Sequence, residues 1–252
     1  MISPRGRLDS FLAKTLNIPK KAVRELLKAE RVTVDGEPAL EMALQIGPFS
    51  QIYLDDTALR AETPRYLMLH KPVGVVSATK DKEHKTVLDL IPEAIRAGLH
   101  IVGRLDLNTS GLVLLSNDSR WSESMMQPGA HVTKEYWVTL ANPLTEDYIA
   151  AFERGFYFET EAITTLPAKL AIVGEREARV ELCEGKYHQI KRMFGRFQNP
   201  VLALHRSRIG ALMLDPDLAP GQWRPLSDDE KRACQKSEGQ AGGLAKIDMK
   251  KD

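Results

Sequence analysis

Short apolar runs of strand length fill most of the chain beyond residue 64, and many follow one another without a helix between them. Directly consecutive strands favour antiparallel pairing, because a parallel pair needs a long crossover connection. The sequence therefore predicts an α+β fold with a mainly antiparallel mixed sheet rather than a doubly wound parallel one. We expect strands at residues 66–70, 100–102, 111–115, 135–140, 168–173, 178–182 and 201–204, and helices at 87–91, 120–126, 144–152 and 188–197.

The first 58 residues follow a different pattern, in which two helical repeats of apolar residues precede a hairpin. Leu8, Leu12 and Leu16 recur at helical spacing, and apolar residues do so again after a proline. The pair Asp35-Gly36 supplies the positive φ angles of a tight hairpin turn. We expect a small domain at residues 1–58, a linker at 55–64, a second domain at 64–231 and a disordered polar tail at 232–252.

Positive charge is concentrated in two segments of a chain whose formal net charge is only +1. Residues 1–31 carry eight basic and three acidic side chains, and residues 186–208 carry six basic side chains and no acid. Such segments are typical of proteins that bind a polyanion, since each cation placed against a phosphate releases condensed counterions. Two solvated helix faces are the alternative interpretation. The candidates for docking the polyanion in the first segment are Arg7, Lys20, Lys21, Arg24, Lys28 and Arg31.

Several classes of protein are disfavoured by what the sequence lacks. No GxxxxGK[ST], GxSxG or HExxH motif occurs, and the only cysteines are Cys183 and Cys234. No apolar run approaches the roughly 18 residues that span a bilayer. We therefore expect a soluble, cytoplasmic, monomeric protein without a membrane segment, a disulfide framework, a metal or a cofactor.

The segment HIVGRLDLNTSGLVLLSND, residues 100–118, is the most informative part of the chain. A predicted strand runs into a glycine, a polar loop follows, and the chain then turns into a second apolar strand. The loop presents Asp106 at the end of a rigid sheet, with Arg104 before it and Thr109 and Ser110 after it. An aspartate that only caps the turn through backbone amides is the alternative interpretation.

The segment GKYHQIKRMFGRF, residues 185–197, predicts an amphipathic helix with one basic face. Gly185 before it permits either an unusual backbone or the close approach of a ligand. Because no acid occurs between residue 186 and Arg208, salt bridges within the segment do not account for this face. The apolar face comprises Ile190, Met193, Phe194 and Phe197, and the basic face comprises His188, Lys191, Arg192 and Arg196.

The predicted strand VTKEYWVTL carries two adjacent aromatic residues, Tyr136 and Trp137, which point to opposite faces of a sheet. A tyrosine on the functional face can stack on a nucleobase and use its hydroxyl as well. A tyrosine packed in the core, with its hydroxyl hydrogen-bonded, fits the same pattern.

Taken in order, YLMLHKPVGVVSAT, GRLDLNTSGL, KEYWV and GKYHQIKRM resemble the motifs of pseudouridine synthases, and the likeness covers about residues 5–230. The N-terminal unit resembles the alpha-L RNA-binding fold of ribosomal protein S-four. KYHQIKRMFG and LHRSRIGALMLDPDLAPGQWRPL look most like the subfamily that modifies 16S ribosomal RNA. The resemblance implies a cofactor-free isomerisation in which a uridine base is detached from its ribose, rotated and rejoined through carbon 5.

The resemblance also implies roles for individual residues. Asp106 is the catalytic carboxylate, either as a nucleophile at the sugar or as the base that starts an elimination to a glycal. Tyr136 stacks on the target base and helps to remove the proton from carbon 5. Lys191 pairs with Asp106, with Arg192 as the substitute. The substrate-binding residues are expected to be Arg104, Thr109, Ser110, His188, Gln189 and Arg192.

The implied substrate is one uridine of 16S ribosomal RNA within an assembling small-subunit particle. A synthase acting on 23S ribosomal RNA is the nearest alternative, and a non-catalytic RNA-binding assembly factor is another. An unrelated hydrolase would need a second catalytic carboxylate, and the sequence offers none at a recognisable place.

Overall fold

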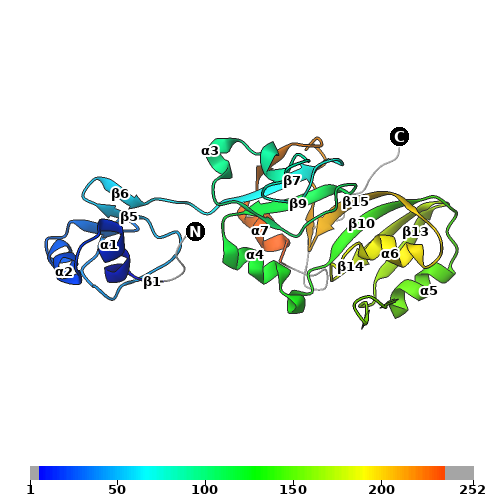
Figure 1. Cartoon of the computed structure of the whole chain (residues 1–252), viewed down its shortest axis with the longest axis horizontal. Coiled ribbons are helices and arrows are strands. Elements are labelled where there is room, and N and C mark those ends of the chain that lie inside the picture. Colours follow the sequence, from blue (N-terminus) through cyan, green and yellow to red (C-terminus); the bar gives the residue numbers. More distant parts are fainter. Residues whose placement is uncertain (1–5, 236–252) are drawn as a thin grey trace. The chain divides into compact units, whose positions relative to one another are not determined.

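The computed structural model describes residues 6–235 and divides the chain into two compact units, with the boundary between Pro64 and Arg65 (Figure 1). Of the segment expected to be a disordered tail, residues 236–252 lie outside the described residues. The expectation is wrong for 232–234, because these residues end a helix and Cys234 is buried in an apolar cluster of the larger unit. Within residues 6–235 no helix is both long and apolar enough to cross a membrane.

The N-terminal unit consists of two short helices and a small antiparallel sheet around one apolar core. The core is formed by Leu8 and Leu12 of the first helix, Val23 and Leu27 of the second, and Val32 of the sheet. The sheet has the order β3-β2-β5-β6, while β1 pairs with β4. The elements are β1 Gly6–Arg7, α1 Leu8–Leu16, α2 Lys20–Lys28, β2 Val32–Val34, β3 Glu37–Pro38, β4 Gln45–Ile46, β5 Ile52–Leu54 and β6 Thr57–Arg60.

Two features of this unit can be compared with the sequence. The hairpin turn is confirmed, because Asp35 and Gly36 have φ angles of 54° and 90°. The interpretation of residues 55–64 as a linker is wrong for 57–60, which form strand β6 and pair with β5. The reason is that Leu59 packs against the small core and β5 has a free edge that accepts another strand.

The larger unit is built on one nine-stranded sheet with the order β13-β14-β10-β15-β9-β7-β17 along its main path. Neighbouring strands are antiparallel except β15 and β9, which run parallel. The predicted mainly antiparallel mixed sheet is thus confirmed. Its main strands are β7 Tyr66–Lys71, β8 His100–Val102, β9 Ser110–Ser116, β10 Lys134–Leu140, β13 Lys169–Gly174, β14 Glu177–Leu182, β15 Val201–Ile209, β16 Leu212–Met213 and β17 Trp223–Pro225.

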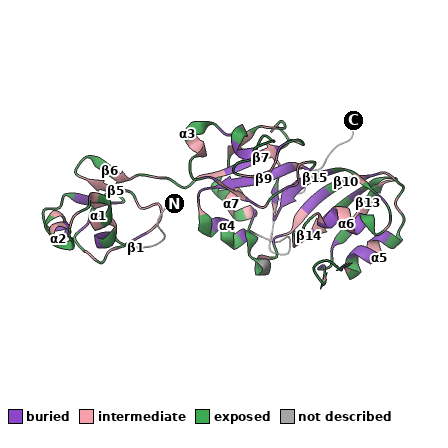
Figure 2. Cartoon of the chain, in the orientation of Figure 1, coloured by how far each residue is buried: buried purple, intermediate pink, exposed green. Residues whose placement is uncertain are grey.

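Apolar clusters lie on both faces of this sheet, and the central strand β9 contributes alternately to each. Leu112 and Leu114 belong to the cluster under α4 Ser119–Met126 and α7 Asp228–Ala233, whereas Val113 and Leu115 belong to the other. Figure 2 shows β9 buried along its length. The second cluster packs under the short 3-10 helix Val87–Leu90, α5 Asp147–Arg154 and α6 Gln189–Gly195. Smaller elements are α3 Glu93–Arg96, the 3-10 helix Pro128–Ala130, β11 Tyr157–Phe158 and β12 Ile163–Thr164.

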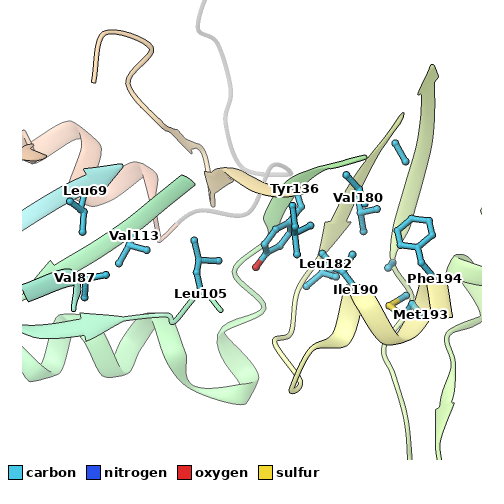
Figure 3. Packing of buried hydrophobic residues seen from close by; sticks show 14 of the residues in the cluster. Leu69, Val87, Leu105, Val113, Tyr136, Val180, Leu182, Ile190, Met193 and Phe194 are labelled. Carbon is cyan, nitrogen blue, oxygen red and sulfur yellow. The ribbon is translucent and has the colours of Figure 1, made fainter. Parts of the chain in front are cut away.

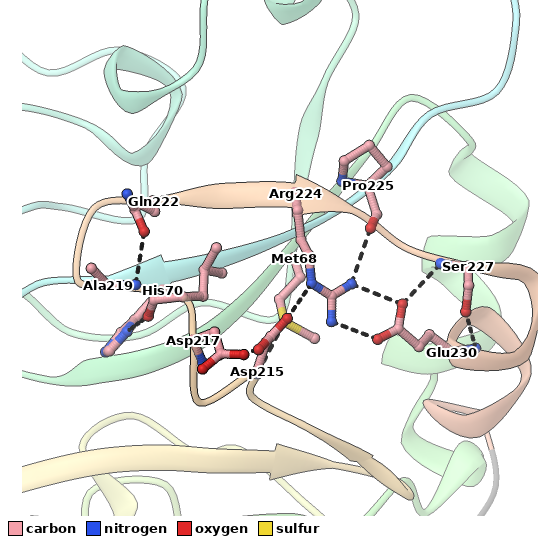
Figure 4. Close-up of polar contacts among 11 residues, drawn as sticks. Met68, His70, Asp215, Asp217, Ala219, Gln222, Arg224, Pro225, Ser227 and Glu230 are labelled. Carbon is pink, nitrogen blue, oxygen red and sulfur yellow. Dashed lines mark hydrogen bonds and ion pairs between the residues drawn. The ribbon is translucent and has the colours of Figure 1, made fainter.

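The end of the described chain returns to the sheet as β17 and α7, which the sequence pattern did not predict. Arg224 of β17 donates to Asp215 at 2.6 Å and to both carboxylate oxygens of Glu230 at 2.9 and 2.7 Å (Figure 4). Glu230 also completes a capping box with Ser227 at the start of α7. The guanidinium of Arg224 thus links the edge strand β17 to helix α7. These two elements are held by polar contacts, which an apolar sequence pattern does not reveal.

Candidate active site

The polar loop at residues 103–109 joins β8 to β9 and lies next to the parallel contact between β9 and β15. Gly111 makes this contact possible. Its φ angle is +110°, and a Cβ atom there would lie 2.2 Å from the carbonyl oxygen of Arg206. Only glycine therefore lets β15 approach β9 so closely. The loop leaves Asp106 partly exposed, at 34% of its side-chain surface.

Two buried cations donate hydrogen bonds to backbone carbonyls of the loop and of the residues next to it. Arg206 is 2% exposed, and its Nε and Nη2 donate to the carbonyls of Leu112 and Gly103 at 2.8 and 2.9 Å. Lys71 is fully buried, and its Nζ donates to the carbonyl of Thr109 at 2.7 Å and of Pro72 at 3.0 Å. Because neither donates to a carboxylate in the described part of the chain, their positive charge is directed at the loop.

Helix α6 and the residue directly before it bring two basic side chains to Asp106. The Nζ atom of Lys191 lies 3.2 Å from Oδ2 of Asp106, and Nε2 of His188 lies 3.4 Å from the same oxygen. His188 has the left-handed backbone angles φ 48° and ψ 33° directly before the helix begins. For a residue other than glycine this conformation costs about 1–2 kcal/mol, and here it turns the imidazole toward the carboxylate.

Tyr136 forms another wall of the same site. Its ring is 8% exposed and belongs to the large apolar cluster. Figure 3 shows the ring between Leu105, on the loop, and Leu182 with Ile190. A cavity of about 100 Å³ is lined by these side chains together with Asp106 and Lys191. Among the described residues the Tyr136 hydroxyl has no hydrogen-bond partner, so it is free to meet a ligand.

The other candidates near Asp106 have different surroundings. Arg104 and Thr109 line the cavity; Arg104 is exposed, and the buried Thr109 hydroxyl has no partner among residues 6–235. Gln189 also lines it, but its amide is engaged by Glu184 and by the backbone of Lys186.

Two predicted residues are not brought to Asp106. Ser110 lies at the start of β9, and its hydroxyl is 2.9 Å from Nδ1 of His205. Arg192 makes a bidentate ion pair with Glu161 at 2.8 and 2.7 Å and lies over the ring of Phe158. Of the predicted pair, Lys191 and not Arg192 therefore contacts Asp106.

The basic candidates of the N-terminal unit line one groove of about 870 Å³, with the exception of Arg31. The buried carboxylate of Asp9 contacts Arg7 at 2.9 Å and Lys20 at 3.3 Å. The hydrogen bond from Arg7 holds the pKa of Asp9 well below its usual range, so Asp9 is a fixed anchor for both cations. Arg31 lies outside the groove and is paired with Asp55. The groove is lined by Arg7, Lys20, Lys21, Arg24 and Lys28.

Sequence reasoning assigned no role to Lys71, Arg206 or Tyr187. Lys71 and Arg206 lie in strands that also contain apolar residues. A charged residue inside such a strand is rarely buried without a partner, and this pattern could have marked both residues as candidates. Tyr187 is 73% exposed and stacks on His188 with ring centroids 3.9 Å apart. Gly185 has no positive φ angle, and a Cβ atom there would meet nothing within 4 Å, so the structure shows open space at this glycine rather than a left-handed backbone.

The buried Lys71 predicts a pH-dependent stability. Burial lowers the pKa of Lys71 from 10.5 to about 8, while nearby Asp106 opposes the shift. Between these values the unfolded chain binds more protons than the folded chain, so stability rises with pH. Relative to Lys71→Met, the free energy of unfolding of the wild type should increase by up to about 3 kcal/mol across this window, measured by urea unfolding. Lys85→Met, at an exposed lysine, should show no such trend; a constant difference for Lys71→Met would contradict the prediction.

The chain is similar to known proteins over most of its length. Residues 65–195 match the RNA pseudouridylate synthase family. Ribosomal small subunit pseudouridine synthase A of Pseudomonas aeruginosa is 48% identical over 225 residues, which cover 89% of this chain and 98% of that protein. The protein of the same name from Escherichia coli K12 is 41% identical, covering 89% and 97%. A crystal structure of pseudouridylate synthase has a TM-score of 0.67 at 36% identity and covers 92% of this chain and 100% of that one.

The matched segment contains the loop with Asp106, Tyr136 and Lys191. The chain therefore belongs to the RNA pseudouridylate synthase family, and it is an enzyme that modifies RNA. Within this family it is similar over most of its length to the proteins named ribosomal small subunit pseudouridine synthase A. The family predicted from the four ordered motifs is confirmed.

Proposed function

We propose that this enzyme converts one uridine of 16S ribosomal RNA into pseudouridine in the cytoplasm, acting as a monomer on the assembling small-subunit particle. The observation that carries the target is the identity of 41% to 48% with proteins named for the small ribosomal subunit, over nearly their whole length. The observation that carries the chemistry is the contact of Asp106 with Lys191 and His188 beside the hydroxyl of Tyr136, which has no hydrogen-bond partner within residues 6–235.

Asp106 is the catalytic carboxylate in this proposal. Both routes implied by the family, attack on the sugar and elimination to a glycal, need an ionised carboxylate at the ribose. The ammonium of Lys191 and Nε2 of His188 both contact Oδ2, which fixes the orientation of the carboxylate and leaves its second oxygen to meet the substrate. The isomerisation breaks the bond between the ribose and nitrogen 1 of the base and forms a bond between the ribose and carbon 5. Carbon 5 loses one proton and nitrogen 1 gains one, so the reaction needs no redox partner.

Tyr136 stacks on the target base and uses its hydroxyl in removing the proton from carbon 5. Arg104 occupies the space that the uridine leaves when it is extruded from the RNA, because it is a long exposed cation beside Asp106. Thr109 lines the same cavity as Asp106, and in this proposal it is a wall of the nucleotide site.

The experiment that tests this function is tritium release from RNA labelled at carbon 5 of uridine. Wild-type protein should release tritium from 16S RNA assembled with small-subunit proteins. The stoichiometry should be one site per RNA. Release from 23S RNA alone would overturn the small-subunit target, and release from neither RNA would favour a binding protein.

The N-terminal unit docks the RNA in this proposal, as an alpha-L RNA-binding domain at about residues 1–58. Its groove holds five cations, of which Arg7 and Lys20 are positioned by the buried Asp9. Contacts from such a groove go to phosphates, and they set affinity and register rather than sequence specificity.

Salt dependence distinguishes this groove from the rest of the helical surface. Lys21→Ala should weaken RNA binding and reduce the slope of log affinity against log salt by about 0.7–0.9, the value for one phosphate contact. Filter binding at several salt concentrations measures both. Lys14→Ala is the matched control, because Lys14 is an exposed lysine of α1 outside the groove. Equal slopes for wild type and Lys21→Ala would contradict docking in the groove.

A further inference from the structure

A second cavity, which we call the neighbour cavity, adjoins the catalytic cavity. It has a volume of about 400 Å³, and both cavities share Arg104, Tyr136 and Gly185 as walls. A Cβ atom built on Gly185 would meet nothing within 4 Å, so the space beside this shared wall is open. The neighbour cavity therefore lies directly beside the cavity in which we place the target uridine, and nothing in the proposed chemistry uses it.

The walls of the neighbour cavity combine apolar side chains with cations. Met125, Val132 and Ile209 are at most 5% exposed and form apolar wall surface, while Met126 is 48% exposed. Methionine is flexible and polarisable, which suits it to a flat, irregular ligand. The cations are Arg104, Lys134 and Arg206, and within residues 6–235 no aspartate or glutamate lines the cavity.

Such a wall fits a ligand that is apolar and flat at one end and anionic at the other. A cationic peptide would find no carboxylate, and a small inorganic anion would leave the apolar surface unused. A nucleotide meets both requirements, because every base has an apolar face and every linkage carries one negative charge. Extruding the target base also deprives its neighbour in the RNA of a stacking partner, at a cost that a second site would offset.

We propose that the neighbour cavity binds the nucleotide adjacent to the target uridine in the RNA chain. Its base packs against Met125, Met126 and Val132, and its phosphate faces Lys134. This inference rests on the proposed isomerisation of an RNA uridine. It assigns to the cavity a share of the substrate selectivity, because the size and orientation of the neighbouring base decide how well the cavity is filled.

The test is a cycle between one protein variant and one RNA change. Met126→Ala should raise KM about fivefold in the tritium-release assay and leave kcat within about twofold, since the lost contact is to the neighbouring base and not to the reacting atoms. An RNA with an abasic residue at one of the two flanking positions should raise the KM of the wild type by at least as much. On that RNA Met126→Ala should cause no further loss, because the contact is already absent.

Met213→Ala is the matched control, because Met213 is 52% exposed and lines neither cavity. On each RNA, the KM of Met213→Ala should equal the KM of the wild-type protein on that same RNA. Unchanged KM for Met126→Ala, or the same loss from Met126→Ala on intact RNA and on both abasic RNAs, would overturn the proposal.

The same cycle is measured by equilibrium binding of a short single-stranded RNA that contains one uridine. This arm separates the two proposals. If the effects of Met126→Ala and the abasic residue on oligonucleotide binding are not additive, but 16S RNA is not converted, the proposal for the neighbour cavity stands and the small-subunit target is wrong. Conversion of 16S RNA without coupling would retain the target and remove the cavity. Absence of coupling in both assays would overturn the cavity whichever RNA is converted.

Discussion

Asp106→Asn protein should release tritium at least about 10³-fold more slowly than wild type from RNA labelled at carbon 5 of uridine. The amide has the size of the carboxylate but cannot act as a nucleophile or a base. It also loses the ionic contact of Oδ2 with Lys191 at 3.2 Å and changes the contact with Nε2 of His188 at 3.4 Å. Single-turnover measurement with excess enzyme reports the chemical step directly.

Folding and RNA binding of Asp106→Asn should be nearly unchanged. The side chain is 34% exposed, and an ion pair so exposed contributes little to stability. The loop itself is held by Lys71 and Arg206 through backbone carbonyls, not through Asp106. Asp217→Asn, at an exposed aspartate distant in sequence, controls for the loss of one negative charge. Activity of Asp106→Asn within tenfold of wild type would rule out Asp106 as the catalytic carboxylate.

Two substitutions of Tyr136 should separate its ring from its hydroxyl. Tyr136→Phe keeps the ring that lines the cavity, so KM should stay near the wild-type value. It removes a hydroxyl that has no hydrogen-bond partner among the described residues, so kcat should fall by about 10² to 10⁴ if that hydroxyl moves a proton. Tyr136→Leu also removes the stacking surface, and KM should rise by about 5- to 150-fold in addition.

Tyr148→Phe is the matched control for Tyr136→Phe. Both tyrosines are less than 10% exposed and belong to the same apolar cluster. The hydroxyl of Tyr148, however, accepts a hydrogen bond from Asn199 at 3.1 Å, away from the catalytic cavity. Tyr148→Phe should therefore affect stability and not kcat. Wild-type kcat in Tyr136→Phe, measured by tritium release, would limit Tyr136 to a packing role.

The apolar pattern predicted most strands of the larger unit to within a few residues, because a residue's burial in a sheet follows the period of two along its own strand. It also predicted α6, because Ile190, Met193 and Phe194 recur at the helical period and are all buried on one face of the helix. It did not predict β6, β17 or α7, whose places depend on polar contacts and free sheet edges elsewhere in the chain. Local periodicity carries no information about such distant partners.

The sequence by itself determined the order of the motifs and the family, because these depend only on which residues follow one another. Only the tertiary structure decided which cation meets Asp106. Lys191 and Arg192 are adjacent in sequence, but consecutive residues of a helix point about 100° apart, so one reaches Asp106 and the other reaches Glu161. The burial of Lys71 and Arg206 beneath the loop was likewise decided by packing, since a positive charge is tolerated there only where carbonyl oxygens from separate segments converge.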